Sequence, residues 1–276
     1  MSSAERPALP SLHTTEVAGT GPGIVFLHGL FGQGKNFSGI AKALSPEFRS
    51  LLVDLPDHGL SDWTERLDYT VMADAVAALI RERNGGEPMH VVGHSMGGKT
   101  AMQLALRHPD LVDRLVVVDV SPVETAGTGE FAHLLEALAG LDLATLGTRA
   151  DADAALTGPI PNPTVRGFLL QNLRRDDTGA WAWRANLSML RRELPAISGF
   201  PAWDGAPFDH PVLWIAGERS DYVTPERVPA MRALFPRARL LTVKDAGHWV
   251  HSERPDIVIE ALRVFLGSGE GPGGPR

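Results

Sequence analysis

The sequence contains no cysteine among its 276 residues. Disulfides, thiolate nucleophiles and cysteine-ligated zinc or iron–sulfur centres are therefore excluded. The HExxH pattern of helical zinc sites is also missing, since the only closely spaced late histidines, His248 and His251, stand three residues apart. We accordingly expect no metal centre.

Positive charge and long apolar runs are scarce as well. Lysine and arginine total 26 against 33 acidic residues, which gives a net charge of −7. Nucleic-acid-binding domains carry a basic patch, so we expect no nucleic-acid partner. No apolar run approaches the roughly 20 residues that cross a bilayer, and the first residues lack the basic and apolar segments of a secretory signal. We therefore predict a cytoplasmic protein without a membrane span.

Short β-branched runs alternate with helical patterns along most of the chain. Most of these runs are continuously apolar, as in strands buried on both faces of a parallel sheet. We expect strands at 23–29, 49–56, 89–95, 114–122, 211–218 and 238–248. Helical patterns occupy 69–85, 96–110 and 255–267. The alternation predicts an α/β fold with a mostly parallel central sheet flanked by helices.

Residues 123–207 interrupt this alternation. They contain no convincing strand but several leucine-rich helical stretches, which predicts a helical cap inserted between late strands of a core formed by 12–122 and 208–266. Open α/β sheets bind ligands at the carboxyl ends of their strands, where such an insertion would cover the site. The alternative is a peripheral helical addition. The Gly/Pro-rich tail 267–276 is predicted to be disordered.

Ser95 stands between two glycines in "GHSMG", residues 93–97. The motif follows an apolar strand pattern and opens a helical one, which is the context of the nucleophile elbow of hydrolases. A nucleophile there needs a turn too tight for flanking side chains. Ser95 is therefore our candidate nucleophile, and an N-capping serine in a glycine-rich turn is the alternative.

Two backbone amides are candidates for an oxyanion hole. The amide of Met96 lies at the expected start of a helix, where the helix dipole favours a negative charge. A second amide is expected from the loop after the first strand, "LHGLFG" at 27–32. We assign it to Leu30, with Phe31 as the alternative.

His248 in "DAGHWVHSERPD" is the candidate general base, because it follows a strand and precedes the last helix. A carboxylate must orient such a histidine. Asp119 ends the run "LVVVD" and Asp221 follows "LWIAGERS". Both aspartates give the chain order Ser, Asp, His of α/β-hydrolases, so the residues alone leave both open.

Taken together, these motifs resemble the α/β-hydrolase superfamily over residues 12–266, including "DLPDHGLSD" at 54–62. The stretches "GHSMGGKTAM", "VVDVSPVE", "WRANL" and "AGHWVHSERP" are most similar to the YbfF-like small esterases and thioesterases. That resemblance implies a small capped esterase whose acid is Asp119. The commoner superfamily pattern has an aspartate where this chain has Ser220, which leaves Asp221 as the alternative acid.

The resulting interpretation is a serine hydrolase that cleaves carboxylic esters with short to medium acyl groups, and acyl thioesters by the same chemistry, without a cofactor. An acyltransferase or a cofactor-free perhydrolase would use the same triad, and a ligand-binding protein without catalysis is a further alternative. Several aromatic side chains are candidates for an apolar acyl pocket, although their spacing equally suits packing within a cap: Phe31, Phe131, Phe168, Trp181 and Trp183.

Overall fold

The computed structural model describes residues 8–124 and 129–267. The predicted disordered tail lies outside these ranges except for Gly267, which is the last residue of helix α11.

The core is a seven-stranded sheet with the order β1-β3-β2-β4-β5-β8-β9. All six predicted strands form and pair in parallel. Their bounds are β2 Gly23–Leu27, β3 Arg49–Val53, β4 Met89–His94, β5 Val112–Val118, β8 Val212–Gly217 and β9 Ala238–Val243. The predicted mostly parallel α/β fold is thereby confirmed.

Strand β1, Thr14–Val17, was not predicted. It pairs antiparallel with β3 at the edge of the sheet, and none of its residues is fully buried. A four-residue edge strand that is half exposed carries no continuous apolar run, so the pattern that reveals buried strands is missing from it.

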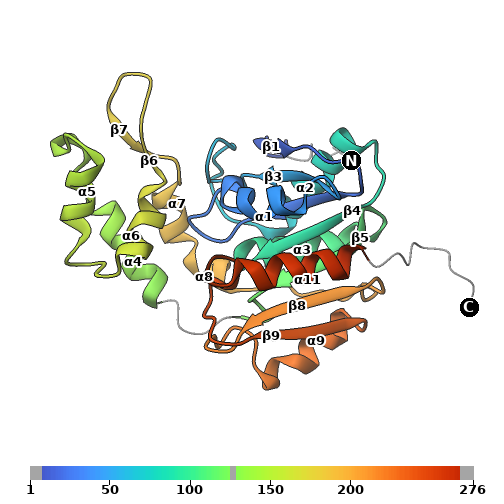
Figure 1. The fold of residues 1–276 in the computed structure, drawn as a ribbon. Helices are drawn as coiled ribbons and strands as arrows, with labels where there is room; N and C mark the ends of the chain where they lie inside the picture. Colours follow the sequence, from blue (N-terminus) through green and yellow to red (C-terminus); the bar gives the residue numbers. More distant parts are fainter. Residues whose placement is uncertain (1–7, 125–128, 268–276) are drawn as a thin grey trace, which may run out of the picture.

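Helices cover both faces of the sheet (Figure 1). On one face α2, Tyr69–Asn84, packs beside α3, Met96–Arg107, and α9, Val228–Leu234, joins the same apolar cluster. The other face is covered by α1, Ser38–Leu44, α10, Val250–Glu253, and α11, Pro255–Gly267. Strand residues such as Val25 and Phe26 are fully buried on opposite faces. This two-sided burial explains their continuously apolar sequence.

The insertion leaves the sheet after β5 and returns before β8, and it projects from the left end of the sheet in Figure 1. Its helices are α4 Gly129–Ala139, α5 Arg149–Leu156, α6 Pro163–Leu170, α7 Leu187–Arg192 and α8 Leu194–Ser198. They bury their own leucines, including Leu135 and Leu169. The insertion is therefore a packed unit of helices standing beside the sheet.

The expectation that 123–207 holds no strand is wrong at one place. Strands β6, Leu173–Arg175, and β7, Trp181–Trp183, form an antiparallel hairpin closed by a turn at 176–180. Each strand has three residues and pairs only with the other. Strands of this length are too short to show a period of two in the sequence.

Within the described residues, no helix combines the length and apolar character needed to traverse a bilayer.

Candidate active site

Ser95 occupies the turn between β4 and α3 in a strained backbone conformation, with φ 53° and ψ −119°. A Cβ on Gly93 would lie 2.3 Å from the Gly97 carbonyl oxygen, and one on Gly97 would lie 2.3 Å from that of Leu27. Both distances are far below van der Waals contact, so only glycine fits at either flank. The turn holds Ser95 at the carboxyl edge of the sheet with 8% of the residue exposed.

Ser95, His248 and Asp119 form a continuous hydrogen-bonded chain. His248 Nε2 lies 3.0 Å from Ser95 Oγ, and its Nδ1 lies 2.8 Å from Asp119 Oδ2. Asp119 follows β5, which pairs directly with β4, the strand that immediately precedes Ser95. His248 is mounted on the loop after β9. The fold thus brings three residues from three strand ends together at one edge.

Asp119 is completely buried and accepts hydrogen bonds from several donors. The Gly217 amide donates to Oδ1 at 2.9 Å, while the Ser220 hydroxyl donates to Oδ2, the same oxygen that faces His248. Ser220 therefore occupies the usual acid position as a supporting donor for Asp119. Asp221 makes no hydrogen bond or ion pair to His248 in the described part of the chain.

Two neighbouring aromatic rings contact the His248 ring. Tyr222 stacks on His248 with ring centroids 4.1 Å apart and an interplanar angle of 22°. His94 approaches from another side, and its Nε2–H donates to the His248 carbonyl at 2.9 Å. Burial, together with neighbouring histidines, lowers the pKa of His94 well below its ordinary value and that of His251 to about 4. Both rings are therefore neutral near pH 7, and His251 packs against His94 at 4.4 Å.

The two amides chosen from the sequence for an oxyanion hole, Leu30 and Met96, have no hydrogen-bond partner among the described residues. Both line the cavity beside Ser95. The alternative, Phe31, already donates its amide to His58 Nε2 at 3.2 Å. The Phe31 amide therefore already has a partner, which favours Leu30 of the two candidates. The assignment of the oxyanion hole stays a prediction.

Two residues that the sequence did not reveal hold this loop. Phe31 adopts φ 64°, which is unfavourable for an aromatic residue and must be stabilised by its surroundings. His58 accepts from its amide, and the side-chain amide of Asn172 donates to its carbonyl at 2.7 Å. Burial lowers the pKa of His58, so its ring is neutral and Nε2 can accept. Asn172 belongs to the insertion, so the insertion contacts the loop that carries Leu30.

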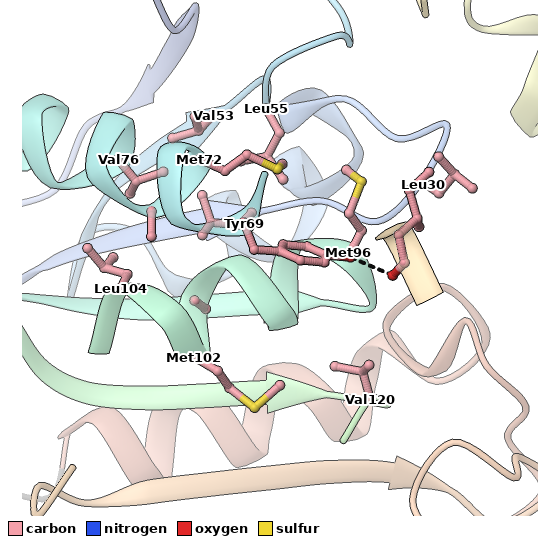
Figure 2. Packing of buried hydrophobic residues seen from close by; sticks show 14 of the residues in the cluster. Leu30, Val53, Leu55, Tyr69, Met72, Val76, Met96, Met102, Leu104 and Val120 are labelled. Atoms are coloured by element: carbon pink, nitrogen blue, oxygen red, sulfur yellow. Dashed lines mark hydrogen bonds between the residues drawn. The ribbon is translucent and has the colours of Figure 1, made fainter. Parts of the chain in front are cut away.

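A cavity of about 400 Å³, counting space open to solvent, lies next to Ser95. It is mainly apolar and is lined by Leu30, Ser95, Met96, Lys99, Val120, Phe131, Leu194, Ile197, Ser198 and Tyr222. Figure 2 shows Leu30, Met96 and Val120 within the buried apolar packing around α3. Little of that volume is enclosed, because the centres of water-sized molecules could occupy only about 30 Å³ of it.

Of the aromatic candidates, only Phe131 lines this cavity. Its ring lies 6.3 Å from that of His248 and 6.4 Å from that of Phe31. Trp181 instead packs under the Arg175 guanidinium at 4.0 Å and donates Nε1–H to the Leu146 carbonyl. Trp183 lies on the same β7 strand, and neither tryptophan lines the cavity. Phe31, Trp181 and Trp183 therefore do not line this cavity, and their assignment to substrate binding stays a prediction.

Lys99 is a further cavity residue that sequence reasoning missed. It is 2% exposed although it carries an ammonium group. Its signal was a lone lysine inside the otherwise small and apolar "MGGKTAM", one helical turn after Ser95.

Across residues 8–124 and 129–267, no group of three histidine, aspartate or glutamate side chains is arranged to hold a metal ion.

Comparisons with known proteins agree with this architecture. Residues 22–255 match the family model described as alpha/beta hydrolase fold. The sn-1-specific diacylglycerol lipase ABHD11 of Mus musculus is 39% identical over 267 residues, covering 95% of this chain and 86% of that protein. Esterase YbfF of Escherichia coli is 34% identical over 247 residues, covering 88% and 92%.

The fold also resembles solved structures. A marine microorganism esterase superposes with a TM-score of 0.90 at 33% identity, covering 93% of this chain and 100% of that one. The similarity therefore includes the insertion as well as the sheet.

Proposed function

The chain belongs to the alpha/beta hydrolase fold family and is a hydrolase of the esterase/lipase type, and from this premise we propose that it cleaves carboxylic esters through an acyl-enzyme on Ser95. The observation that carries the proposal is the chain of hydrogen bonds from Ser95 through His248 to Asp119, 3.0 and 2.8 Å long. Such a chain is the arrangement that activates a serine hydroxyl.

In the proposed reaction, Ser95 Oγ attacks the acyl carbon while His248 Nε2 takes the hydroxyl proton. Asp119 stabilises the resulting imidazolium and holds its Nδ1–H toward the buried carboxylate. The amides of Met96 and Leu30 donate to the oxyanion. His248 then gives the proton to the leaving alkoxide, and a water molecule repeats the sequence on the acyl-enzyme. No step requires a group from outside the chain other than water.

We propose short to medium acyl groups as substrates, and acyl thioesters beside oxygen esters because the attacking geometry is the same. The apolar lining of the cavity supports an acyl group as the ligand, and its small enclosed volume supports the short end of this range. Phe131, Leu194 and Ile197 belong to the insertion and form part of the cavity lining. Residues 123–207 are therefore proposed to act as a cap that restricts the acyl group.

The decisive experiment combines turnover with covalent labelling. Ser95→Ala should lower kcat for p-nitrophenyl butyrate by on the order of 10⁶-fold, as removal of a triad serine does elsewhere. A fluorophosphonate probe should label the wild type and fail to label Ser95→Ala. Ser188→Ala, at an exposed position of α7, is the matched control and should keep both. A folded wild type that neither hydrolyses esters nor reacts with the probe would instead indicate a ligand-binding protein.

A further inference from the structure

Lys99 is a buried cation beside Ser95 that the proposed reaction does not use. It lies one helical turn further along α3, and its amide donates to the Ser95 carbonyl at 3.0 Å. Within the described ranges its ammonium forms no ion pair with a carboxylate. A buried ammonium is strongly unfavourable unless hydrogen bonds satisfy it, so its partners indicate its role.

Those partners are three successive carbonyls of the insertion. Lys99 Nζ donates to the carbonyl oxygens of Ile197 at 3.2 Å, Ser198 at 2.5 Å and Gly199 at 2.8 Å. They stand at the carboxyl end of α8, where helix carbonyls lack internal partners and carry partial negative charge. The Tyr69 hydroxyl also donates to the Ile197 carbonyl at 2.7 Å, the dashed line in Figure 2. Two side chains of the core therefore hold the end of α8.

Helix α8 is also a wall of the cavity. Leu194, Ile197 and Ser198 line it opposite the α3 residues that follow Ser95. The helix has only five residues, so few hydrogen bonds of its own keep its end in place. The position of α8 therefore decides how much space an acyl group finds next to Ser95.

We propose that Lys99 is a specificity-determining positioning residue, which fixes the carboxyl end of α8 against α3 and thereby limits the length of the acyl group. The inference rests on the proposed ester hydrolysis and names the residue that selects among esters. Without the ammonium, the Tyr69 hydrogen bond still joins the carboxyl end of α8 to α2, but the hydrogen bonds from Lys99 on α3 are lost and apolar contacts remain. Leu194 and Ile197 can then retract and admit longer acyl chains.

The test compares wild type with Lys99→Met, which keeps the length of the side chain but removes its donors. We would measure kcat/KM for the p-nitrophenyl esters of acetate, butyrate, hexanoate and octanoate. The octanoate-to-acetate ratio should rise about tenfold or more, since a methylene in an apolar pocket is worth at least that factor. Lys99→Arg keeps the charge and the donors, so its ratio should stay near that of wild type. General damage to the enzyme would lower kcat/KM for all four esters alike and leave the ratio unchanged. An unchanged ratio in folded Lys99→Met would therefore overturn the proposal.

The same assay separates this proposal from the proposed function. If the wild type cleaves none of the four esters and resists the fluorophosphonate probe, ester hydrolysis itself is refuted and the role of Lys99 falls with it. If the wild type cleaves them and Lys99→Met shows the same ratio, only the role of Lys99 is refuted.

Should Lys99→Met fail to fold, the wild type provides a second measurement. Burial lowers the pKa of Lys99 to about 7, with Arg227 adding to the decrease and Glu124 opposing it. Tyr69, whose ring centroid is 6.0 Å away, has a pKa raised by burial and stays neutral. The ammonium donates three hydrogen bonds and the neutral amine only two, so the octanoate-to-acetate ratio should increase as pH rises through about 7. A group that acts in the chemical step affects both esters alike and cancels from the ratio. A ratio that does not change with pH would therefore overturn the proposal.

Discussion

The sheet edge and the insertion hold their functional residues by different means. At the sheet edge, Ser95 and Asp119 sit directly after buried strands in left-handed backbone conformations with φ of 53° and 51°. Parallel strand pairing and close glycine contacts leave them no freedom. The insertion is instead joined to the core by side-chain contacts: polar ones such as those of Asn172 and Asn186, and apolar ones within a shared cluster.

This difference separates chemistry from selectivity. A strand end can be displaced only by disturbing the sheet, so the proposed triad has a single geometry. The insertion is held by contacts between side chains rather than by strand pairing, and it supplies part of the cavity wall. Changes at the sheet edge should therefore abolish turnover, whereas changes in the insertion should alter which esters are cleaved and how fast.

The largest effect in this comparison is expected at Asp119. Asp119→Asn should lower kcat at neutral pH by roughly 10⁴-fold, because the amide no longer fixes the His248 tautomer or stabilises its positive charge. Asp221→Asn is the matched control and should remain close to wild type, since Asp221 does not contact His248. Steady-state kinetics on p-nitrophenyl butyrate would measure both. If Asp221→Asn lost kcat and Asp119→Asn kept it, Asp221 and not Asp119 would be the carboxylate that orients His248.

The contact between the insertion and the oxyanion loop should give the next largest effect. Asn172→Leu removes the donor to the Phe31 carbonyl, and a displaced Leu30 amide should lower kcat by about 10- to 100-fold. Asn186→Leu is the control: it removes another buried insertion amide, which binds Asp57 rather than the loop. It should lower the melting temperature with kcat preserved. Equal losses of kcat in both variants would show that the insertion acts only through overall stability.

A cap over the site should also discriminate between whole substrates. Soluble short-chain esters should be cleaved faster than emulsified long-chain triglycerides, by about tenfold or more, because the small enclosed cavity beside Ser95 cannot hold a bulky acyl group. Titration of released acid at matched ester concentration would measure this. Faster cleavage of the triglycerides would contradict the proposed cap.

The smallest effect is expected when two aromatic residues of the insertion, Phe131 and Trp181, are each replaced by alanine. Phe131→Ala enlarges the cavity next to His248 and should raise KM for butyrate esters several-fold, because part of the apolar contact with the acyl group is lost. Trp181→Ala removes a larger ring from the β6–β7 hairpin and should leave KM unchanged. Its cost should be confined to stability, measured by thermal unfolding. A comparable rise of KM in Trp181→Ala would instead show that Trp181 contributes to substrate binding.

The sequence by itself determined the parallel strands and the position of Ser95 in its turn, because these depend on neighbouring residues. Continuous apolar runs follow from burial on both faces of the sheet, and Gly93 and Gly97 follow from the tightness of one turn. The position of His248 on a loop after a late strand could be predicted from the same kind of local pattern. The catalytic roles of these residues stay predictions.

Only the tertiary structure decided which groups meet across long stretches of chain. Asp119, and not Asp221, contacts His248 because β5 pairs with β4, and Ser220 supports it from 101 residues away. His58 takes the Phe31 amide, and Lys99 reaches α8 across 98 to 100 residues. Such contacts leave no periodic or spacing signal in either segment, since each partner satisfies a hydrogen bond that exists only once the sheet and the insertion have packed.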